Sequence, residues 1–450
     1  MKSALVALLV FMWMPFILFK PHIGVLVWNW VSHMSPHAYT FGFAASFPFL
    51  VFVGFLTLAG VILAREPKEF PSHPIMTAIL MYVSWTIVTY ALGFEPSVGE
   101  GKIVQFMKMV AFALITAIVM QSPNRLKAFV YVMVASLMFV AVKGGLFTIA
   151  TGGGNSVNDG RGMMGDNNQL AMALAMLFPL AIFLAQYPPY KIMKWPLTGA
   201  AFLVPIAAIG TQSRGGLVAI ASVLFMLLLK SKRKFTLIAI IVPIAIGAVT
   251  FMPDSWKNRM QSTENATEDA SFQGRMSMWR FASNVANDHP IEGGGFDVFY
   301  ISYLGPEYMP PGYKMRAPHS IYFEVLGEHG WVGLFLFLTM LFTGYYSAGT
   351  TAKMFRPYQE TKWIGDLSGG IQLSIVGYAV GGLTVNIAAF DVFYHLLIIV
   401  ILCRVVGDKM VDKGVNKIVT KTEARVKSKG KWKPSAPAKQ PPLPAERLIN

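Results

Sequence analysis

Residues 319–344 read HSIYFEVLGEHGWVGLFLFLTMLFTG, in which a polar start carrying His319 and Glu324 leads into a long apolar run. A helix needs about 20 mainly apolar residues to cross the hydrocarbon core of a membrane. This stretch therefore predicts a membrane span with ionisable groups at one boundary. Gly327, Gly330 and Gly333 recur every three residues, a spacing that favours close packing against a neighbouring helix.

Apolar runs of the same kind fill the chain on either side. Of the 450 residues, 54% are hydrophobic and only 14% are charged, which is more apolar surface than one soluble core can bury. About a dozen spans would use roughly half of such a chain. We therefore predict an all-α polytopic membrane protein with twelve spans, near residues 4–19, 46–64, 73–93, 104–121, 127–148, 168–186, 195–210, 213–229, 235–252, 319–344, 367–384 and 387–404.

Lysine and arginine residues in the short loops indicate the orientation of the spans. They cluster on alternate loops, near residues 65–68, 125–127, 191–194, 230–234 and 353–362. Loops rich in these residues stay in the cytoplasm. Twelve spans would place both termini in the cytoplasm and leave outside the segments 20–45, 94–103, 149–167, 211–212 and 253–318.

The formal net charge of +15 is unevenly distributed along the chain. Twelve lysines and arginines but only four acidic residues lie between Arg404 and the end. A basic, proline-rich stretch of this composition does not pack into a core. We predict a transmembrane domain at residues 1–408 and a disordered cytoplasmic tail at 409–450 that attracts anionic membrane lipids. The charge therefore does not indicate a nucleic-acid partner.

The outer segment 253–318 is too long to be a simple connection, so it is expected to be structured or functional. Within it, Phe272, Met276, Trp279 and Ala282 recur at helical spacing. Apolar residues at this spacing form a stripe along one face of a helix. We predict a helix in the run SFQGRMSMWRFASNV that lies on the membrane surface.

Ionisable residues near the outer ends of the spans are the candidates for function, because a charge at membrane depth is costly and faces a polar cavity. Lys143, Arg214 and His319 all reach the outer boundary in the predicted topology. These cations and one imidazole converge where the phosphate of a lipid-linked substrate would lie. The outer loops and the start of the tenth span add the candidates Arg161, Asp166, Asn167, Asn168, Arg275, Arg280 and Glu324.

Arg214 and His319 have the clearest chemical roles among these candidates. The guanidinium of Arg214 is a rigid fork of donors suited to a diphosphate, and the two glycines that follow it allow close approach of a neighbouring backbone. The alternative is an arginine that only extends to the membrane interface. The imidazole of His319 can act as a general base near neutral pH, or it can be structural.

The other outer candidates have alternatives of their own. Asp166 or Asn167 can cap the helix that follows, while the amides of Asn167 and Asn168 also suit sugar hydroxyls. Arg275 and Arg280 are five residues apart, hence about 140° apart around a helix, so they do not serve one anion equally. One of the two can simply face solvent.

Motifs for a metal or a cofactor are missing from the outer segments. They contain no HExxH, no CxxC pair, no paired carboxylates and no phosphate-binding glycine loop. We therefore predict no metal ion and no cofactor. His329, Asp391 and His395 lie within spans, and we interpret them as structural residues.

The motifs taken together resemble the bacterial O-antigen ligase and polymerase superfamily. The residues that carry this resemblance are SRGG at 213–216, GRMSMW at 274–279, GGGF at 293–296 and HSIYFEVLGEHGWVG at 319–333. A second set is similar to the O-glycosylation ligases associated with exosortase A systems: WNWVSHMSPHAYTFGFA at 28–44, VKGGLFTIATGGG at 142–154, DNNQLAMALAM at 166–176 and MPDSW at 252–256. The resemblance spans roughly residues 1–345.

The resemblance implies transfer of a glycan from undecaprenyl diphosphate to an acceptor hydroxyl, at the periplasmic face of the bacterial inner membrane. The acceptor would be a protein, a lipid or a glycan. The family's essential positions carry over onto Arg214, Arg275 and His319, which would stabilise the diphosphate and act as general base without a metal. The alternatives are a polymerase that extends the lipid-linked glycan and, from another class, a transporter or flippase for lipid-linked sugars.

Overall fold

The computed structural model describes residues 2–158, 166–232 and 270–428, with six single positions at 234–236, 238, 239 and 242; side chains are described as far as residue 412, except at 270 and 271. Every regular element in this part of the chain is a helix, which confirms the predicted fold class. Seven of these helices are long and apolar enough to cross a membrane, so the chain is a multi-pass membrane protein. The total of twelve spans stays a prediction, and most of the ninth, 235–252, lies outside the described residues.

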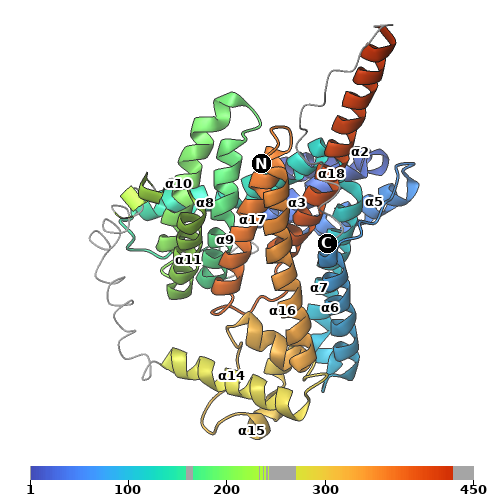
Figure 1. The fold of residues 1–450 in the computed structure, drawn as a ribbon. Coiled ribbons are helices and arrows are strands. Elements are labelled where there is room, and N and C mark those ends of the chain that lie inside the picture. The colour runs from blue at the N-terminus through green and yellow to red at the C-terminus, as the bar shows by residue number, and fades with distance from the viewer. Residues whose placement is uncertain are drawn as a thin grey trace. The chain divides into compact units, whose positions relative to one another are not determined.

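The first helices form a packed N-terminal group, which is drawn in blue in Figure 1. Helix α3 packs against α2, α5 and α8. The backbone N–H of Ala44 donates to the Ser3 hydroxyl over 3.0 Å, which ties the start of the group to its middle. The elements are α1 (Lys2–Phe11), α2 (Met14–Phe19), α3 (Pro21–Met34), η1 (Pro36–Tyr39), α4 (Phe43–Ser46) and α5 (Phe49–Leu63).

The segment 20–45 is predicted to lie outside the membrane between two spans, and the structure differs from this prediction. It holds a helix of 14 residues, α3, because Pro21 supplies a preset φ at the first helical position. Besides Lys20, the charges that act on the His22 ring come from Arg125 and Glu66, which belong to loops predicted to be cytoplasmic. The start of α3 therefore lies beside those loops and not on the opposite side from them.

The long helices coincide with the predicted spans and pack as neighbours. Helix α9 lies against α10, α11 and α17, while α16 lies against α6 and α17. Proline begins three of these helices, where its missing N–H costs no hydrogen bond. They are α6 (Pro74–Leu92), α7 (Pro96–Val119), α8 (Pro123–Ala150), α9 (Asn167–Gln186), η2 (Lys191–Met193), α10 (Lys194–Gly210), α11 (Arg214–Lys230), α16 (Ile321–Phe355), α17 (Lys362–Gly381) and α18 (Asp391–Ser428).

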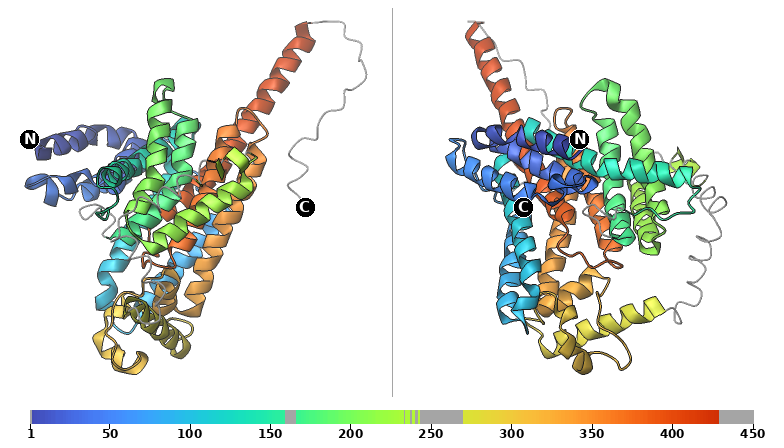
Figure 2. Two further views of the ribbon diagram at one scale, coloured as in Figure 1. Left: turned by 90° about the vertical axis from the view of Figure 1, so that its left-hand side faces the viewer. Right: turned by 180° about the vertical axis from the view of Figure 1, so that it is seen from behind.

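The outer segment contains the predicted helix, α14 (Ala270–Asp288), followed by η3 (Val298–Tyr300), η4 (Ser302–Leu304) and α15 (Gly305–Tyr308). Helices α14 and α15 lie together at one end, beyond the ends of α6, α7 and α16 (Figures 1 and 2). The buried stripe of α14 runs through Met278, Phe281, Ala282 and Val285, which pack against η3, η4 and α15. Phe272 is exposed, so the apolar face is rotated from the predicted one toward this small core.

Helix α16 is two helices joined at Gly330. This residue has φ 67° and ψ −171°, which no regular helix contains. A side chain there would meet the carbonyl oxygens of Ile291 at 2.6 Å and Pro290 at 2.8 Å. Gly327 and Gly333 are also closely packed, against Phe299 and His329. The predicted glycine stripe therefore serves close packing, but at a break in the helix.

The chain divides into two compact units, residues 1–406 and 407–450. Helix α18 runs through the boundary to Ser428, so helical structure extends into the stretch for which disorder is predicted. Residues 429–450 lie outside the described part of the chain. The division into a domain at 1–408 and a tail at 409–450 stays a prediction.

Gly330→Ala should lower the free energy of unfolding by more than about 2 kcal/mol, because it adds strain at positive φ and a clash with two carbonyl groups. Gly101→Ala is the matched control, since Gly101 lies on α7 with open space around it. Its expected effect is neutral or a gain of about 0.5–1 kcal/mol, as for any exposed helical glycine. Chemical denaturation of the purified protein in detergent checks both. Equal effects of the two substitutions would contradict the proposed break at Gly330.

Candidate functional site

The turn between α10 and α11 presents Arg214 at the first position of α11. Ser213 caps this helix, because its hydroxyl accepts a hydrogen bond from the Gly216 N–H over 3.0 Å. Gln212 adopts φ 55°, and its amide donates to the Gly153 carbonyl over 3.0 Å. The glycine cluster that follows α8 therefore supports the turn that carries Arg214.

The DNN run at the start of α9 is bonded to the same turn. The Asp166 carboxylate caps α9 by accepting from the Asn168 and Gln169 N–H groups, so the capping role is confirmed. The Asn167 amide donates to the Thr211 carbonyl over 2.9 Å. The Ser213 hydroxyl donates to Oδ1 of Asn168 over 2.7 Å. Both asparagines thus hold the Arg214 turn, and their predicted contact with sugar hydroxyls stays a prediction.

His319 stands directly before α16 with its backbone in the left-handed region, at φ 50°. Non-glycine residues adopt this conformation only where their surroundings hold it. On one side, Nε1 of Trp279 donates to the Pro318 carbonyl over 2.9 Å. On the other side, the Ile321 N–H donates to the Gly382 carbonyl over 2.8 Å. The imidazole is half-buried, and its Nδ1 has no hydrogen-bond partner within the described residues.

The electrostatics around His319 favour the neutral imidazole. Burial lowers the pKa of this histidine below its usual value of 6.5, and the positive charges of Arg275 and Arg316 lower it further. The carboxylate of Asp166 opposes this shift. The ring is therefore neutral at physiological pH, which is the form able to accept a proton. Arg275 and Asp166, both predicted site residues, are accordingly close enough to act on His319.

The loop between α17 and α18 links Arg214 to His319. Its first residue, Gly382, accepts the hydrogen bond from Ile321, and two residues later Thr384 packs against Gly215 so closely that no side chain fits there. Arg214 and His319 therefore flank one loop, although they are 105 positions apart in the chain. No ionisable residue marks this loop in the sequence, which reads GLTVNIAAF at 382–390.

The remaining predicted residues have separate environments. Arg280 is exposed, while Arg275 is partly buried, as expected for two positions on different faces of α14. Lys143 is exposed on α8, and its ammonium lies 4.9 Å from the centre of the Tyr39 ring. Arg161 lies outside the described residues. The predicted roles of Lys143, Arg161 and Arg280 in substrate binding stay predictions.

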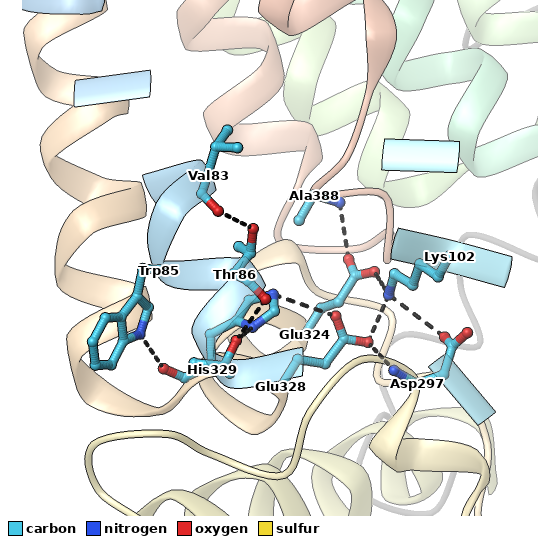
Figure 3. A network of polar contacts seen from close by, with 10 residues as sticks. Val83, Trp85, Thr86, Lys102, Asp297, Glu324, Glu328, His329 and Ala388 are labelled. Carbon is cyan, nitrogen blue, oxygen red and sulfur yellow. Dashed lines mark hydrogen bonds and ion pairs between the residues drawn. The ribbon is translucent and has the colours of Figure 1, made fainter. Parts of the chain in front are cut away.

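Glu324 belongs to a buried network centred on Lys102 of α7 (Figure 3). The Lys102 ammonium lies 2.7 Å from Glu324, 2.6 Å from Glu328 and 3.6 Å from Asp297. The second oxygen of Glu324 accepts from the Ala388 N–H over 2.9 Å, in the loop that flanks Arg214 and His319. In this network Glu324 holds the loop between α17 and α18 in place. Its contact with substrate stays a prediction.

The network also anchors residues 294–297 of the outer segment. Glu328 accepts from the Asp297 N–H over 2.9 Å. The N–H groups of Gly294 and Gly295 donate to the Gly327 and Glu328 carbonyls, over 2.8 and 2.9 Å. The sequence analysis does not predict the role of Lys102. Two features of the sequence could have indicated it: Lys102 stands at the start of the apolar run 103–119, and the acids at 324 and 328 lie one helical turn apart.

Lys102→Met should lower the free energy of unfolding by about 3–5 kcal/mol, because it leaves two buried carboxylates without their cation. Lys108→Met on the same helix removes an exposed lysine and should change stability by less than about 0.5 kcal/mol. Denaturation of both variants in detergent checks this difference. A loss below about 1 kcal/mol for Lys102→Met would show that the network is not a stability element.

Two family models match regions of the chain. Residues 1–188 match a family model described as a family of unknown function, and residues 199–338 match the model described as O-antigen ligase. No curated protein matches the chain. The second match contains Arg214, Arg275 and His319, and it indicates glycan transfer of the ligase or polymerase type by a multi-pass membrane protein. Residues 199–338 therefore carry an O-antigen ligase domain, which supports the predicted superfamily, while the narrower likeness to the ligases of exosortase A systems stays a prediction.

Proposed function

We propose that the protein transfers a glycan from undecaprenyl diphosphate to an acceptor hydroxyl of a protein, a lipid or a glycan, at the periplasmic face of the bacterial inner membrane. The observation that carries the proposal is the half-buried His319 imidazole, kept neutral beside Arg275 and linked through one loop to Arg214. These are the groups that a single displacement at the anomeric carbon needs: a base and a receptor for a diphosphate leaving group.

His319 is the proposed general base. The acceptor oxygen attacks the anomeric carbon of the sugar, and its proton passes to the unprotonated ring nitrogen of His319. As this bond forms, the bond from the anomeric carbon to the diphosphate oxygen breaks, and the configuration at the carbon inverts. The proton is later lost from His319 to water. A neutral imidazole at working pH is required for the first step, and the lowered pKa of His319 provides it.

Arg214 and Arg275 are the proposed receptors for the leaving group. Negative charge grows on undecaprenyl diphosphate as its bond to the sugar breaks, so fixed guanidinium groups stabilise the transition state more than the ground state. Arg214 at the first position of α11 adds the positive end of a helix dipole to its own charge. Two such cations take the part that a metal ion plays in other glycosyl transfers, so the proposed reaction is independent of metal.

Further groups are proposed to bind the rest of the substrate. Lys143, Arg161 and Arg280 supply positive charge at the same boundary, and Asp166, Asn167, Asn168 and Glu324 supply acceptors and amides for sugar hydroxyls. Membrane lipids surround the polyprenyl chain of the donor. The proposal needs no cofactor.

Replacing His319 or Arg214 by Gln should reduce the rate of glycan transfer by about 10²–10⁴-fold, because each change removes a group that acts in the transition state. The assay uses purified protein, a defined undecaprenyl diphosphate glycan, and protein, lipid A core and glycan acceptors offered separately. Mass spectrometry of the products identifies the acceptor. Longer lipid-linked chains formed without a second acceptor would instead assign a polymerase.

Matched controls are His289→Gln, which changes a histidine of the outer segment, and Arg65→Gln, which changes an exposed arginine of another loop. Both should transfer at the native rate. If His319→Gln and Arg214→Gln also transferred at the native rate, the proposed mechanism would be wrong. Movement of the lipid-linked sugar across vesicle membranes without any bond formation would assign a transporter.

The pH dependence of transfer should follow the charges around His319. Rates should rise with pH along a limb centred below pH 6.5 and then level off, because only the neutral ring accepts a proton. Arg316→Gln removes a positive charge, so it should raise the pKa and move this limb to higher pH. Asp166→Asn keeps a helix cap but removes a negative charge, so it should move the limb to lower pH. Rate–pH profiles check both, and shifts in the same direction would contradict His319 as the titrating group.

A further inference from the structure

A second cluster of ionisable side chains shares no residue with the proposed transfer site. His33 lies near the end of α3, and Asp391 and His395 lie in the first two turns of α18. One ring nitrogen of each histidine and one carboxylate oxygen of Asp391 all lie within 4.8 Å of one another. The exposed fractions of the three residues are 2%, 8% and 0%, so the cluster is enclosed.

The contacts within the cluster leave several polar atoms without partners. Nδ1 of His395 lies 2.7 Å from Oδ1 of Asp391, and Nε2 of His33 lies 3.8 Å from Oδ2. Within the described residues, Nε2 of His33 and Nε2 of His395 have no hydrogen-bond partner. Buried polar atoms are almost always paired. Two unpaired imidazole nitrogens in one enclosed cluster point to a ligand that is not a protein side chain.

Neighbouring groups orient the cluster as the outer shell of a metal site would. Nδ1 of His33 donates to the Asn29 carbonyl over 2.8 Å, which leaves the lone pair on Nε2, the atom that faces Asp391. The Ser32 hydroxyl donates to Oδ2 of Asp391 over 2.9 Å. A backbone carbonyl behind a histidine and a hydroxyl behind a carboxylate are the usual partners of metal ligands, because they fix tautomer and orientation.

We propose that His33, Asp391 and His395 form a binding site for a divalent transition-metal ion, and that zinc fits it best. Two imidazoles and one carboxylate are ligands that zinc accepts, with a fourth position left for water. Bonds of about 2.0–2.2 Å separate tetrahedral ligands by about 3.3–3.6 Å. The spread of 4.8 Å therefore needs only small side-chain rotations. The ion also neutralises a carboxylate that is costly to bury at membrane depth.

The role of this ion would be to join two parts of the chain. His33 lies in the region that matches the family of unknown function, and α18 lies beyond both matched regions. A metal ion between them ties the N-terminal helices to the last helix of the bundle. Because none of its ligands is His319, Arg214 or Arg275, the ion stabilises the fold and takes no part in the proposed transfer.

The test is metal binding by the whole chain, purified in detergent without a histidine tag and stripped with a chelator. After dialysis against Zn²⁺, about one equivalent should remain bound, and Co²⁺ should give the visible absorption of a tetrahedral site. His33→Gln and Asp391→Asn should each weaken zinc binding by at least about tenfold, as losses around a metal site do. His22→Gln changes another histidine of α3 and should bind zinc as the native chain does.

Two results would overturn the proposal. Zinc bound equally by the native chain and by His33→Gln would place the metal elsewhere. Absence of both bound zinc and the cobalt absorption would mean that His395 and Asp391 share a proton in place of a metal ion. Stripping the metal should lower the thermal transition while the rate of glycan transfer at low temperature stays within about twofold of the native rate. The metal site and the proposed transfer activity therefore fail or succeed separately.

Discussion

The ion pairs of the Lys102 ammonium group with Glu324 and Glu328 are the interactions on which the surroundings of Arg214 and His319 depend. Glu324 and Glu328 are almost fully buried one turn apart on α16, and two carboxylates in that position cost several kcal/mol each without a cation. Lys102 supplies that cation from α7. Through Asp297 and Ala388, the same network fixes the turn at residues 294–297 and the loop beside Arg214 and His319. The positions of both loops thus follow from one buried charge cluster.

Hydrogen bonds on both sides of His319 hold its backbone in the left-handed conformation. A left-handed conformation at a non-glycine residue costs of order 1 kcal/mol or more. The carbonyl before His319 is held by Trp279, and the N–H of Ile321 is held by Gly382. Trp279 also stacks on Phe323, with ring centres 4.7 Å apart. The imidazole is therefore positioned before any substrate arrives, as a base in a preorganised site must be.

Much of the fold can be predicted from apolar runs alone, because a membrane span has a fixed length and composition. The predicted spans 73–93 and 127–148 end within a few residues of the ends of α6 and α8. Apolar runs do not predict the helix in segment 20–45, because α3 is short and carries the polar residues His22, Asn29 and His33. The phase of α14 was also wrong, since its buried stripe is set by η3, η4 and α15, which no local pattern indicates.

Motifs and the predicted topology together indicate the candidate polar residues such as Arg214 and His319, and the structure adds which contacts hold them. Asp166 as a helix cap follows from its position before an apolar run. The pairing of Lys102 with its acids and of His33 with Asp391 and His395 cannot be predicted in the same way, because these partners lie more than 190 positions apart along the chain. Pairings over such distances depend on which helices pack together, and hydrophobic periodicity does not contain that information.

The hydrogen bonds that join Asn167 and Asn168 with Thr211 and Ser213 have a consequence for how this protein can be divided. They cross the boundary between the region of unknown function and the O-antigen ligase region. The first region is therefore not a separable module. Chimeras that exchange residues 1–188 with those of a relative would have to carry the matching turn with them, and any evolutionary shuffling of the two regions would face the same requirement.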